Sequence, residues 1–305
     1  MFRKAVSLLA RQSWFRKFIM STPVIRELAG RFVGGDDLAS GLAVVRSLNA
    51  KGIKGSLNFH GMHVLDSGEA RRATSEAIEA LRQIRAEGLD SNISVKLTKI
   101  GLDIDPSLCR THLRQIIDTA METGGFVRID MEESIYVDRT IEMFEEVQDL
   151  CGGRNVGIVI QSYLRHRPDD LGRLMGRRAG IRIVKGGYRE SRDVVFRAKA
   201  EVDAAFLRDI ERLLGQKGLH GIATHDEDVI AQTKAWQSEQ GLGKDGFEFQ
   251  MLYGVRPDLQ EKLVAEGYLV RCYIPYGGDW ATHLAGCLRR IPLDTYARLR
   301  RSLVK

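Results

Sequence analysis

Residues 181–190 read IRIVKGGYRE, a short β-type run that ends in two glycines and a tyrosine. Alternate side chains of a strand face the same way, so we expect Arg182, Val184 and Gly186 to share one face. A guanidinium within an apolar strand, followed by a turn almost without side chains, has two explanations. Either a flat ligand approaches the backbone at the glycines, or the arginine pairs with a carboxylate such as Asp130 and ties strands together. Both could hold at once.

Similar β-rich runs recur along the chain, separated by segments with apolar residues at three- and four-residue spacing. The predicted strands are residues 55–59, 93–97, 127–131, 157–163, 181–186, 221–225, 247–252 and 270–276. The predicted helices between them are residues 70–87, 106–123, 139–151, 168–178, 199–214, 227–240 and 257–267. This alternation predicts an α/β fold, a closed and distorted (β/α)8 TIM barrel, with a doubly wound open sheet as the alternative.

The chain has 305 residues, which suits one such barrel with short additional helices. We expect an N-terminal helical arm over residues 1–50 and the barrel over residues 51–305, with a C-terminal helix over the barrel mouth. The first twenty residues contain five Arg or Lys and no acid. They predict a helix that packs on the domain. The alternative is a helix on the anionic inner face of a membrane, which would make the protein peripheral there.

The composition argues against several classes of function. The net charge is +6, but no compact Lys/Arg block is interleaved with aromatic residues, so no nucleic-acid partner is expected. The four cysteines form no CxxC pair, which fits a reducing cytoplasm better than a zinc ribbon or a redox dithiol. His60 and His63 lack a second ligand pair, so no metal site is predicted.

Polar side chains recur near the ends of the predicted strands, and the carboxyl ends form the mouth that carries the active site of such a barrel. They are Lys96, Arg128, Asp130, Glu132, Gln161, Tyr163, Arg182, Thr224, His225, Glu248 and Gln250. A positive charge at Arg182 would stabilise a flat ring that gains negative charge, as a flavin does on reduction. Lys199 is one of several cations available to the phosphates of a dinucleotide. The GxGxxG match at residues 241–246 follows a helix, so no Rossmann site is expected.

Seven motifs together resemble the proline dehydrogenase family, which includes the proline dehydrogenase domain of bifunctional proline-utilisation flavoenzymes. The resemblance runs from about residue 40 to residue 280 in unbroken order. The motifs are SVKLT (94–98), FVRIDME (126–132), VIQSYL (159–164), RIVKGGY (182–188), IATHD (222–226), FEFQMLYG (247–254) and YIPYGGDW (273–280). Each motif alone is weak, but seven of them at barrel-strand spacing are specific.

The resemblance implies that the chain binds FAD noncovalently. It also implies oxidation of proline to Δ1-pyrroline-5-carboxylate by hydride transfer from the carbon next to nitrogen to flavin N5, with a quinone or another acceptor taking the electrons. By position, the flavin contacts would be Asp130, Gln161, Arg182, Val184, Gly186, Tyr188, Lys199, Thr224 and His225. The substrate contacts would be Lys96, Leu252, Tyr273, Arg289 and Arg290. The catalytic set would be Lys96, Asp130, Arg182 and Tyr273.

The chain departs from the family pattern on the substrate side. Met62 stands where the family carries a gate glutamate. The family's last barrel helix carries Tyr-x-x-Arg-Arg-x-x-Glu, but here Gly286 replaces the tyrosine and Leu293 replaces the glutamate. We therefore expect an intact flavin half and an altered substrate half. The substrate could be proline or another cyclic or N-substituted amino acid.

Two other functions stay open at this point. One is a barrel lyase or aldolase that uses Lys96 or Lys185 as a Schiff-base amine. The other is an altered family member that binds flavin without oxidising proline.

Overall fold

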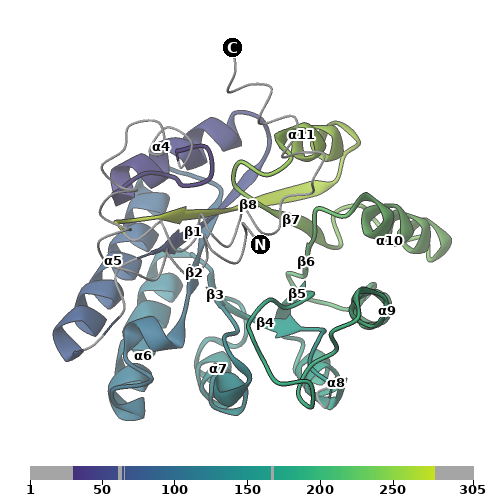
Figure 1. Ribbon diagram of the computed structural model, residues 1–305. Helices are drawn as coiled ribbons and strands as arrows, with labels where there is room; N and C mark the ends of the chain where they lie inside the picture. The colour runs from purple at the N-terminus through teal and green to yellow at the C-terminus, as the bar shows by residue number, and fades with distance from the viewer. Residues whose placement is uncertain (1–29, 61–63, 65, 166–167, 279–305) are drawn as a thin grey trace, which may run out of the picture.

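The computed structural model describes residues 30–60, 64, 66–165 and 168–278. Its strands are parallel neighbours in chain order, and β8 closes on β1 (Figure 1). The strands are β1 (Lys54–Phe59), β2 (Ser91–Val95), β3 (Val127–Ile129), β4 (Val156–Gln161), β5 (Gly180–Val184), β6 (Gly221–Ala223), β7 (Glu248–Leu252) and β8 (Leu269–Tyr276). The predicted closed barrel is confirmed, and the open sheet is wrong.

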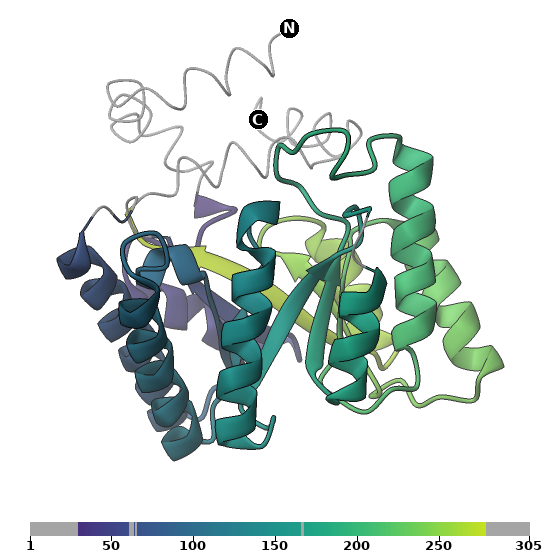
Figure 2. The same ribbon diagram turned by 90° about the horizontal axis from the view of Figure 1, so that it is seen from below.

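Helices lie around the outside of the barrel (Figure 1, Figure 2). Those described are α4 (Leu38–Asn49), α5 (Ser67–Ala86), α6 (Pro106–Thr123), α7 (Val137–Cys151), α8 (Pro168–Gly176), α9 (Lys199–Leu213), α10 (Glu227–Glu239) and α11 (Pro257–Ala265). Two short 3₁₀ turns follow strands at the mouth, η1 (Leu97–Ile100) after β2 and η2 (Ser134–Tyr136) after β3. Each of the seven predicted helices is present, within three residues of its expected ends.

Local chemistry sets several helix boundaries. The side chain of Asp66 accepts from the backbone N–H groups of Gly68 and Glu69 and so caps the start of α5. Asp105 caps α6 in the same way, and Pro106 occupies the first turn, where its missing N–H costs no helical bond. These caps fix where α5 and α6 begin after β1 and β2.

The barrel has an apolar outside and a polar inside. Outward strand side chains such as Ile158, Ile183 and Phe249 are fully buried beneath the helices and form the hydrophobic core. The alternate, inward positions carry polar and charged residues, and these are also almost fully buried: Ser56, Ser94, Arg128, Arg182, Glu248, Gln250 and Arg271. Because buried polar groups need partners, this interior is where specific contacts concentrate.

Several strands end earlier than the sequence predicts. β2 ends at Val95 and β3 at Ile129, so Lys96 and Asp130 lie just past their strands. β6 ends at Ala223, which leaves Thr224 in the following loop. Lys96, Asp130 and Thr224 therefore stand on the rim of the barrel, at the carboxyl ends of their strands.

Helix α4 packs against β1 and β8, where the barrel closes. The proposed boundary at residue 50 therefore separates α4 from strands that it contacts, and that boundary stays a prediction. No helix among the described residues is long and apolar enough to cross a membrane. The predictions for the N-terminal helix, Met62, Arg289, Arg290 and the C-terminal helix lie outside the described residues.

Candidate active site

Toward the amino ends of the strands, the barrel interior holds a layer of buried charges. Arg128 on β3 donates to the carbonyl oxygens of Gly180 at 2.6 Å and Leu219 at 3.0 Å. Burial lowers the pKa of its guanidinium to about 9. Arg271 on β8 donates to Glu248 on β7 at 2.6 Å. These groups join strands below the mouth, so we assign them a structural role.

Inward glycines on three neighbouring strands leave the room that long side chains occupy. A Cβ atom at Gly157 on β4 would lie 2.5 Å from Arg128 Nη1. Gly180 is its partner in register on β5, and Gly221 on β6 is the partner of Arg182. At these positions β4, β5 and β6 carry no inward side chains, and side chains from other strands fill the space next to their backbone.

Arg182 lies one layer nearer the mouth, and three of its four partners come from strands β1, β2 and β7. Nη1 donates to Asp130 Oδ1 at 2.9 Å, and Nε donates to Gln250 Oε1 at 2.5 Å. Nη2 donates to Ser94 Oγ at 3.1 Å and to Ser56 Oγ at 3.4 Å. The guanidinium is therefore fixed inside the barrel, and the carboxylate pair with Asp130 expected as one explanation of the strand is present.

The second oxygen of Asp130 binds a tyrosine. Tyr273 Oη donates to Asp130 Oδ2 at 2.8 Å, and the Arg182 guanidinium lies 5.4 Å from the centre of the Tyr273 ring. Burial, with the neighbouring carboxylate, holds the pKa of Tyr273 well above its usual value of 10. The phenol thus stays protonated and can donate throughout the physiological pH range.

A buried carboxylate lies next to Lys96 at the rim. Glu132 accepts from the backbone N–H of Thr98 at 3.1 Å and from its hydroxyl at 2.7 Å. Burial raises the pKa of Glu132, and the nearby Lys96 charge opposes that rise. Gln161 Nε2 donates to the backbone carbonyl of Glu132 at 2.8 Å. Glu132 therefore fixes the turn that carries Lys96, a role that sequence reasoning did not assign.

The loop after β5 depends on a glycine. Gly186 has a φ of +101°, and a Cβ atom there would lie 2.5 Å from Tyr163 Cε1. Tyr188 follows in this loop, close enough to Tyr273 to contribute to the raised pKa of that phenol. The carboxylate of Glu190 accepts from the backbone N–H of Ser134 at 2.6 Å, which ties the loop to the neighbouring one.

The end of β6 presents a hydroxyl and an imidazole. Thr224 Oγ1 accepts from the backbone N–H of Asp226 at 3.1 Å. His225 Nε2 accepts from the backbone N–H of Leu252 at 2.9 Å. Because that nitrogen accepts, a neutral His225 carries its proton on Nδ1.

Two lysines that the sequence analysis singled out belong to a different cluster. Lys199 at the start of α9 is 81% exposed and pairs with Asp203. Lys185 faces outward from β5 and donates to Asp203 at 2.6 Å and to Asp226 at 3.0 Å. Its amine is therefore not in the barrel interior, which argues against Lys185 as a Schiff-base residue. The structure does not bring Lys199 together with the polar residues around Arg182.

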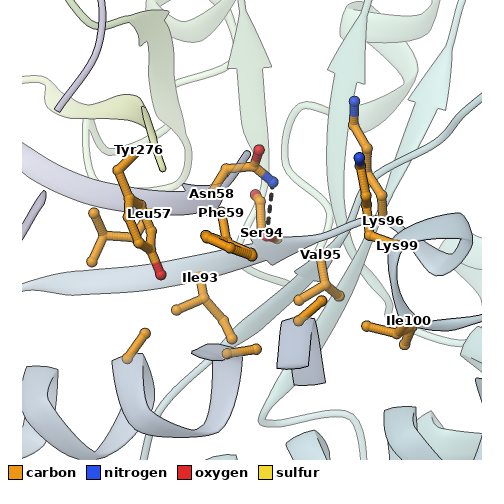
Figure 3. A pocket seen from close by; sticks show the side chains of 13 residues that line it. Leu57, Asn58, Phe59, Ile93, Ser94, Val95, Lys96, Lys99, Ile100 and Tyr276 are labelled. Atoms are coloured by element: carbon orange, nitrogen blue, oxygen red, sulfur yellow. Dashed lines mark hydrogen bonds between the residues drawn. The ribbon is translucent and has the colours of Figure 1, made fainter. Parts of the chain in front are cut away.

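A small cavity of about 30 Å³ lies between β1, β2 and α5 (Figure 3). Apolar side chains such as Leu57, Ile93 and Val95 line most of it, while Lys96 and Lys99 point away from them in the same direction (Figure 3). A space of this size holds about one water molecule. We therefore regard this cavity as a packing gap behind the barrel wall and not as the ligand site.

The residues around Arg182 suit a flavin. Val184 and Leu252 end their strands as partly exposed inward residues, above a layer that is almost fully buried. Apolar side chains at the rim can contact a flat ring. Guanidinium, amide, hydroxyl and imidazole groups surround them and match the oxygens and nitrogens of such a ring. The residues present therefore fit FAD.

Comparison with known proteins supports the same family. A family model described as proline dehydrogenase matches residues 42–291. The chain belongs to the proline dehydrogenase family. It is accordingly an oxidoreductase of the class that acts on the CH–NH group of proline, and the family expectation from the strand-end motifs is confirmed.

Curated proline dehydrogenases match this family member over most of their length. The proline dehydrogenase of Deinococcus radiodurans is 36% identical over 295 residues, which cover 96% of this chain and 94% of that protein. Proline dehydrogenase 1 of Bacillus subtilis is 36% identical over 263 residues, or 86% of this chain and 85% of that protein. The bifunctional protein PutA of Escherichia coli is 27% identical over 88% of this chain, but the match covers only 23% of PutA.

Two solved structures share the fold of this proline dehydrogenase family member. Proline utilization A from Bdellovibrio bacteriovorus, inactivated by N-propargylglycine, superposes with a TM-score of 0.79 at 23% identity, over 86% of this chain and 32% of that one. The protein of the same name from Corynebacterium freiburgense gives a TM-score of 0.76 at 24% identity, over 99% of this chain and 34% of that one. At such identities these structures show the fold alone.

The structure brings together most of the predicted site residues of this proline dehydrogenase family member. Arg182, Asp130 and Tyr273 are in direct contact, and the other predicted residues that share the mouth with them are Lys96, Gln161, Val184, Gly186, Tyr188, Thr224, His225 and Leu252. Sequence reasoning missed the roles of Ser56 and Ser94, which occupy inward-facing positions of β1 and β2. It named Gln250 as a strand residue but did not include it in the site.

Proposed function

We propose that the enzyme oxidises proline, or a proline-like cyclic or N-substituted amino acid, with FAD as the bound cofactor. The observation that carries the proposal is the Arg182–Asp130–Tyr273 set at the carboxyl ends of the strands. It joins a fixed cation, its carboxylate partner and a phenol donor within one buried site. Family membership supports the reaction class, and this set would supply a fixed positive charge and a hydrogen-bond donor at the proposed site.

When bound, FAD would supply the acceptor for a hydride from the carbon next to the substrate nitrogen. The residues that would hold it share the barrel mouth, apart from Lys199 at the exposed start of α9. Arg182 would place a positive charge beside the ring and favour its reduced, more negative form. The proposed flavin contacts are Asp130, Gln161, Arg182, Val184, Gly186, Tyr188, Lys199, Thr224 and His225.

The substrate would lie between the flavin and the rim residues. Lys96 would bind its carboxylate as a charge-assisted partner, and Leu252 and Tyr273 would contact its ring. Arg289 and Arg290 remain our proposal for the second half of the carboxylate site. Fixing the carboxylate would orient the reacting C–H bond and so lower the entropic cost of reaching the reacting geometry.

The electrons would pass to a quinone or another acceptor, and we propose a cytoplasmic location for the reaction. Met62 replaces the family's gate glutamate, and the last-helix motif lacks its tyrosine and glutamate. These changes favour a substrate with a modified ring or a substituted nitrogen as much as proline itself.

The test is an anaerobic flavin-bleaching screen. The purified protein, supplied with FAD, is mixed with proline, hydroxyprolines, pipecolate and N-methylproline, and the absorbance of the oxidised flavin is followed. We expect a yellow protein that at least one of these compounds bleaches. A protein that stays colourless with FAD contradicts the cofactor, and a yellow protein that none of them bleaches contradicts the substrate class.

A further inference from the structure

We infer that Gln250 is a positioning residue for Arg182: its side chain occupies the room left by Gly221, and its oxygen accepts from Nε and so helps to fix the plane of the guanidinium that would face the flavin. The inference rests on the proposed function. It adds a residue that acts through Arg182 and not on the substrate.

Gln250 reaches Arg182 across a whole strand. Gln250 is on β7 and Arg182 on β5, and β6 lies between them. The partner of Arg182 on β6 is Gly221, and a Cβ atom there would lie 2.5 Å from Gln250 Cδ. Gly221 is not among the residues with positive φ, so its backbone does not require glycine. The absence of a side chain at this position therefore serves to admit the amide.

The three nitrogens of Arg182 are each held from a different direction. Nη1 binds Asp130 after β3, and Nη2 binds Ser94 on β2. Nε binds only Gln250 among the described residues. Asp130 also accepts a hydrogen bond from Tyr273, so Arg182 and Tyr273 together fix the position of its carboxylate. Without Gln250, Nε would lose its acceptor, and the guanidinium would be held only at its two terminal nitrogens, by Asp130 and by the hydroxyls of Ser94 and Ser56. We expect its plane, and with it the position of the charge at the mouth, to be less sharply fixed.

The orientation of the Gln250 amide has a cost. With its oxygen toward Arg182, its Nε2 group is buried and has no hydrogen-bond partner among the described residues. The opposite orientation would place an N–H group against the Arg182 N–H. Among the described residues, the hydrogen bond that sets the orientation of this amide is therefore the one to Arg182.

A neutral acceptor also leaves the local charge unchanged. Asp130 already balances the positive charge of Arg182 within the buried set. A glutamate at position 250 would accept the same hydrogen bond but make the set net negative. That change would disfavour a reduced flavin, which carries more negative charge than the oxidised form. An amide holds the guanidinium without this effect.

The experiment compares the holoproteins of wild type, Gln250→Leu and Gln250→Glu. The matched control is Gln148→Leu, because Gln148 Oε1 also accepts from an arginine Nε, that of Arg177 at 2.8 Å, outside the barrel. For each protein we would measure the ratio of reduced to oxidised flavin against a reference dye. We would also measure the dissociation constant of FAD, and kcat and KM for the substrate found in the bleaching screen.

We expect Gln250→Leu to lower the reduced-to-oxidised ratio by roughly tenfold, about 30 mV for a two-electron couple, and Gln250→Glu to lower it further. kcat should fall in the same order, while KM stays within about twofold. Gln148→Leu should leave the ratio and kcat at their wild-type values. Ratios of both Gln250 variants within twofold of wild type would overturn the inference. A wild-type protein that binds no flavin would instead remove the proposed function.

Gly221→Ala tests the same inference without altering the Gln250 amide itself. Its methyl group should displace the Gln250 side chain and lower the reduced-to-oxidised ratio as Gln250→Leu does. In the double variant Gly221→Ala/Gln250→Leu the amide is already absent, so the two decreases in the reduced-to-oxidised ratio should not add. Full additivity of the two substitutions would show that Gly221 acts by another route and would contradict the pairing.

Discussion

Asp130 Oδ1 lies 2.9 Å from Arg182 Nη1 at the mouth of a closed barrel, and both side chains are buried. A pair of this kind gains little over an apolar core as long as it is intact, because removing both charges from water costs nearly what their attraction returns. Breaking it from one side is much worse, since the remaining charge is buried and uncompensated. The pair is therefore better explained by the charge that it fixes at this place than by stability.

Arg182→Met should destabilise the apoprotein by about 3–5 kcal/mol, because it leaves Asp130 buried without its cation. The double variant Arg182→Met/Asp130→Asn should recover part of that loss. Urea unfolding of the apoproteins measures both values. The same single variant should bind FAD more weakly or reduce it more slowly. Wild-type flavin spectra and rates in Arg182→Met would remove this residue from the flavin site.

Gly186→Ala tests the loop after β5. Gly88 is the control, because it also has a positive φ, +63°, but no atom within 4 Å of an added Cβ. Gly88→Ala should cost about 1–2 kcal/mol, from backbone strain alone. Gly186→Ala should cost more, because Tyr163 must also move, and it should lower the flavin content of the purified protein. Equal costs and equal flavin content would contradict the close contact with Tyr163.

Glu132 should make stability depend on pH. Burial raises its pKa, and Lys96 and the bonds from Thr98 offset only part of the rise. The unfolded chain thus releases this proton at a lower pH than the folded chain does. As pH rises through that interval, the carboxyl contributes progressively less to the free energy of unfolding. The advantage of wild type over Glu132→Gln in urea unfolding should therefore shrink as the pH rises above 4.5, the ordinary pKa of a glutamate, and a difference that stays constant with pH would contradict it.

The proposed carboxylate contacts predict a selective effect on KM. Lys96→Met, Arg289→Met and Arg290→Met should each raise KM for a carboxylate substrate, by about 1.5–3 kcal/mol of lost binding, roughly 10- to 100-fold. Lys51→Met is the control, because Lys51 pairs with Glu261 on the surface. Steady-state kinetics measure all four. If neither arginine variant changes KM, these arginines are not the carboxylate clamp.

The sequence predicts the barrel well because apolar runs at regular spacing depend on burial alone. It predicts strand ends less well: hydrogen bonding to the neighbouring strands decides where β3 and β6 stop, and residues such as Asp130 and Thr224 carry no local sign of it. The part of the site that the sequence did not predict consists of contacts between residues far apart in the chain. Ser94 and Gln250 meet Arg182 from positions 88 and 68 residues away. A serine or glutamine on an inward strand position has no pattern of its own until the barrel is closed.

The inward glycines of β4, β5 and β6, which are Gly157, Gly180 and Gly221, have an evolutionary consequence. Arg128 fits only because position 157 has no side chain, and Gln250 fits only because position 221 has none. At position 157 an added Cβ atom would also lie 2.5 Å from the carbonyl oxygen of Gly180, so glycine should persist there whatever residue stands at 128. At position 221 the nearest atoms all belong to the Gln250 side chain, so side-chain volumes at 250 and 221 should vary inversely across natural relatives. Libraries that aim to change the substrate range should randomise positions 250 and 221 together.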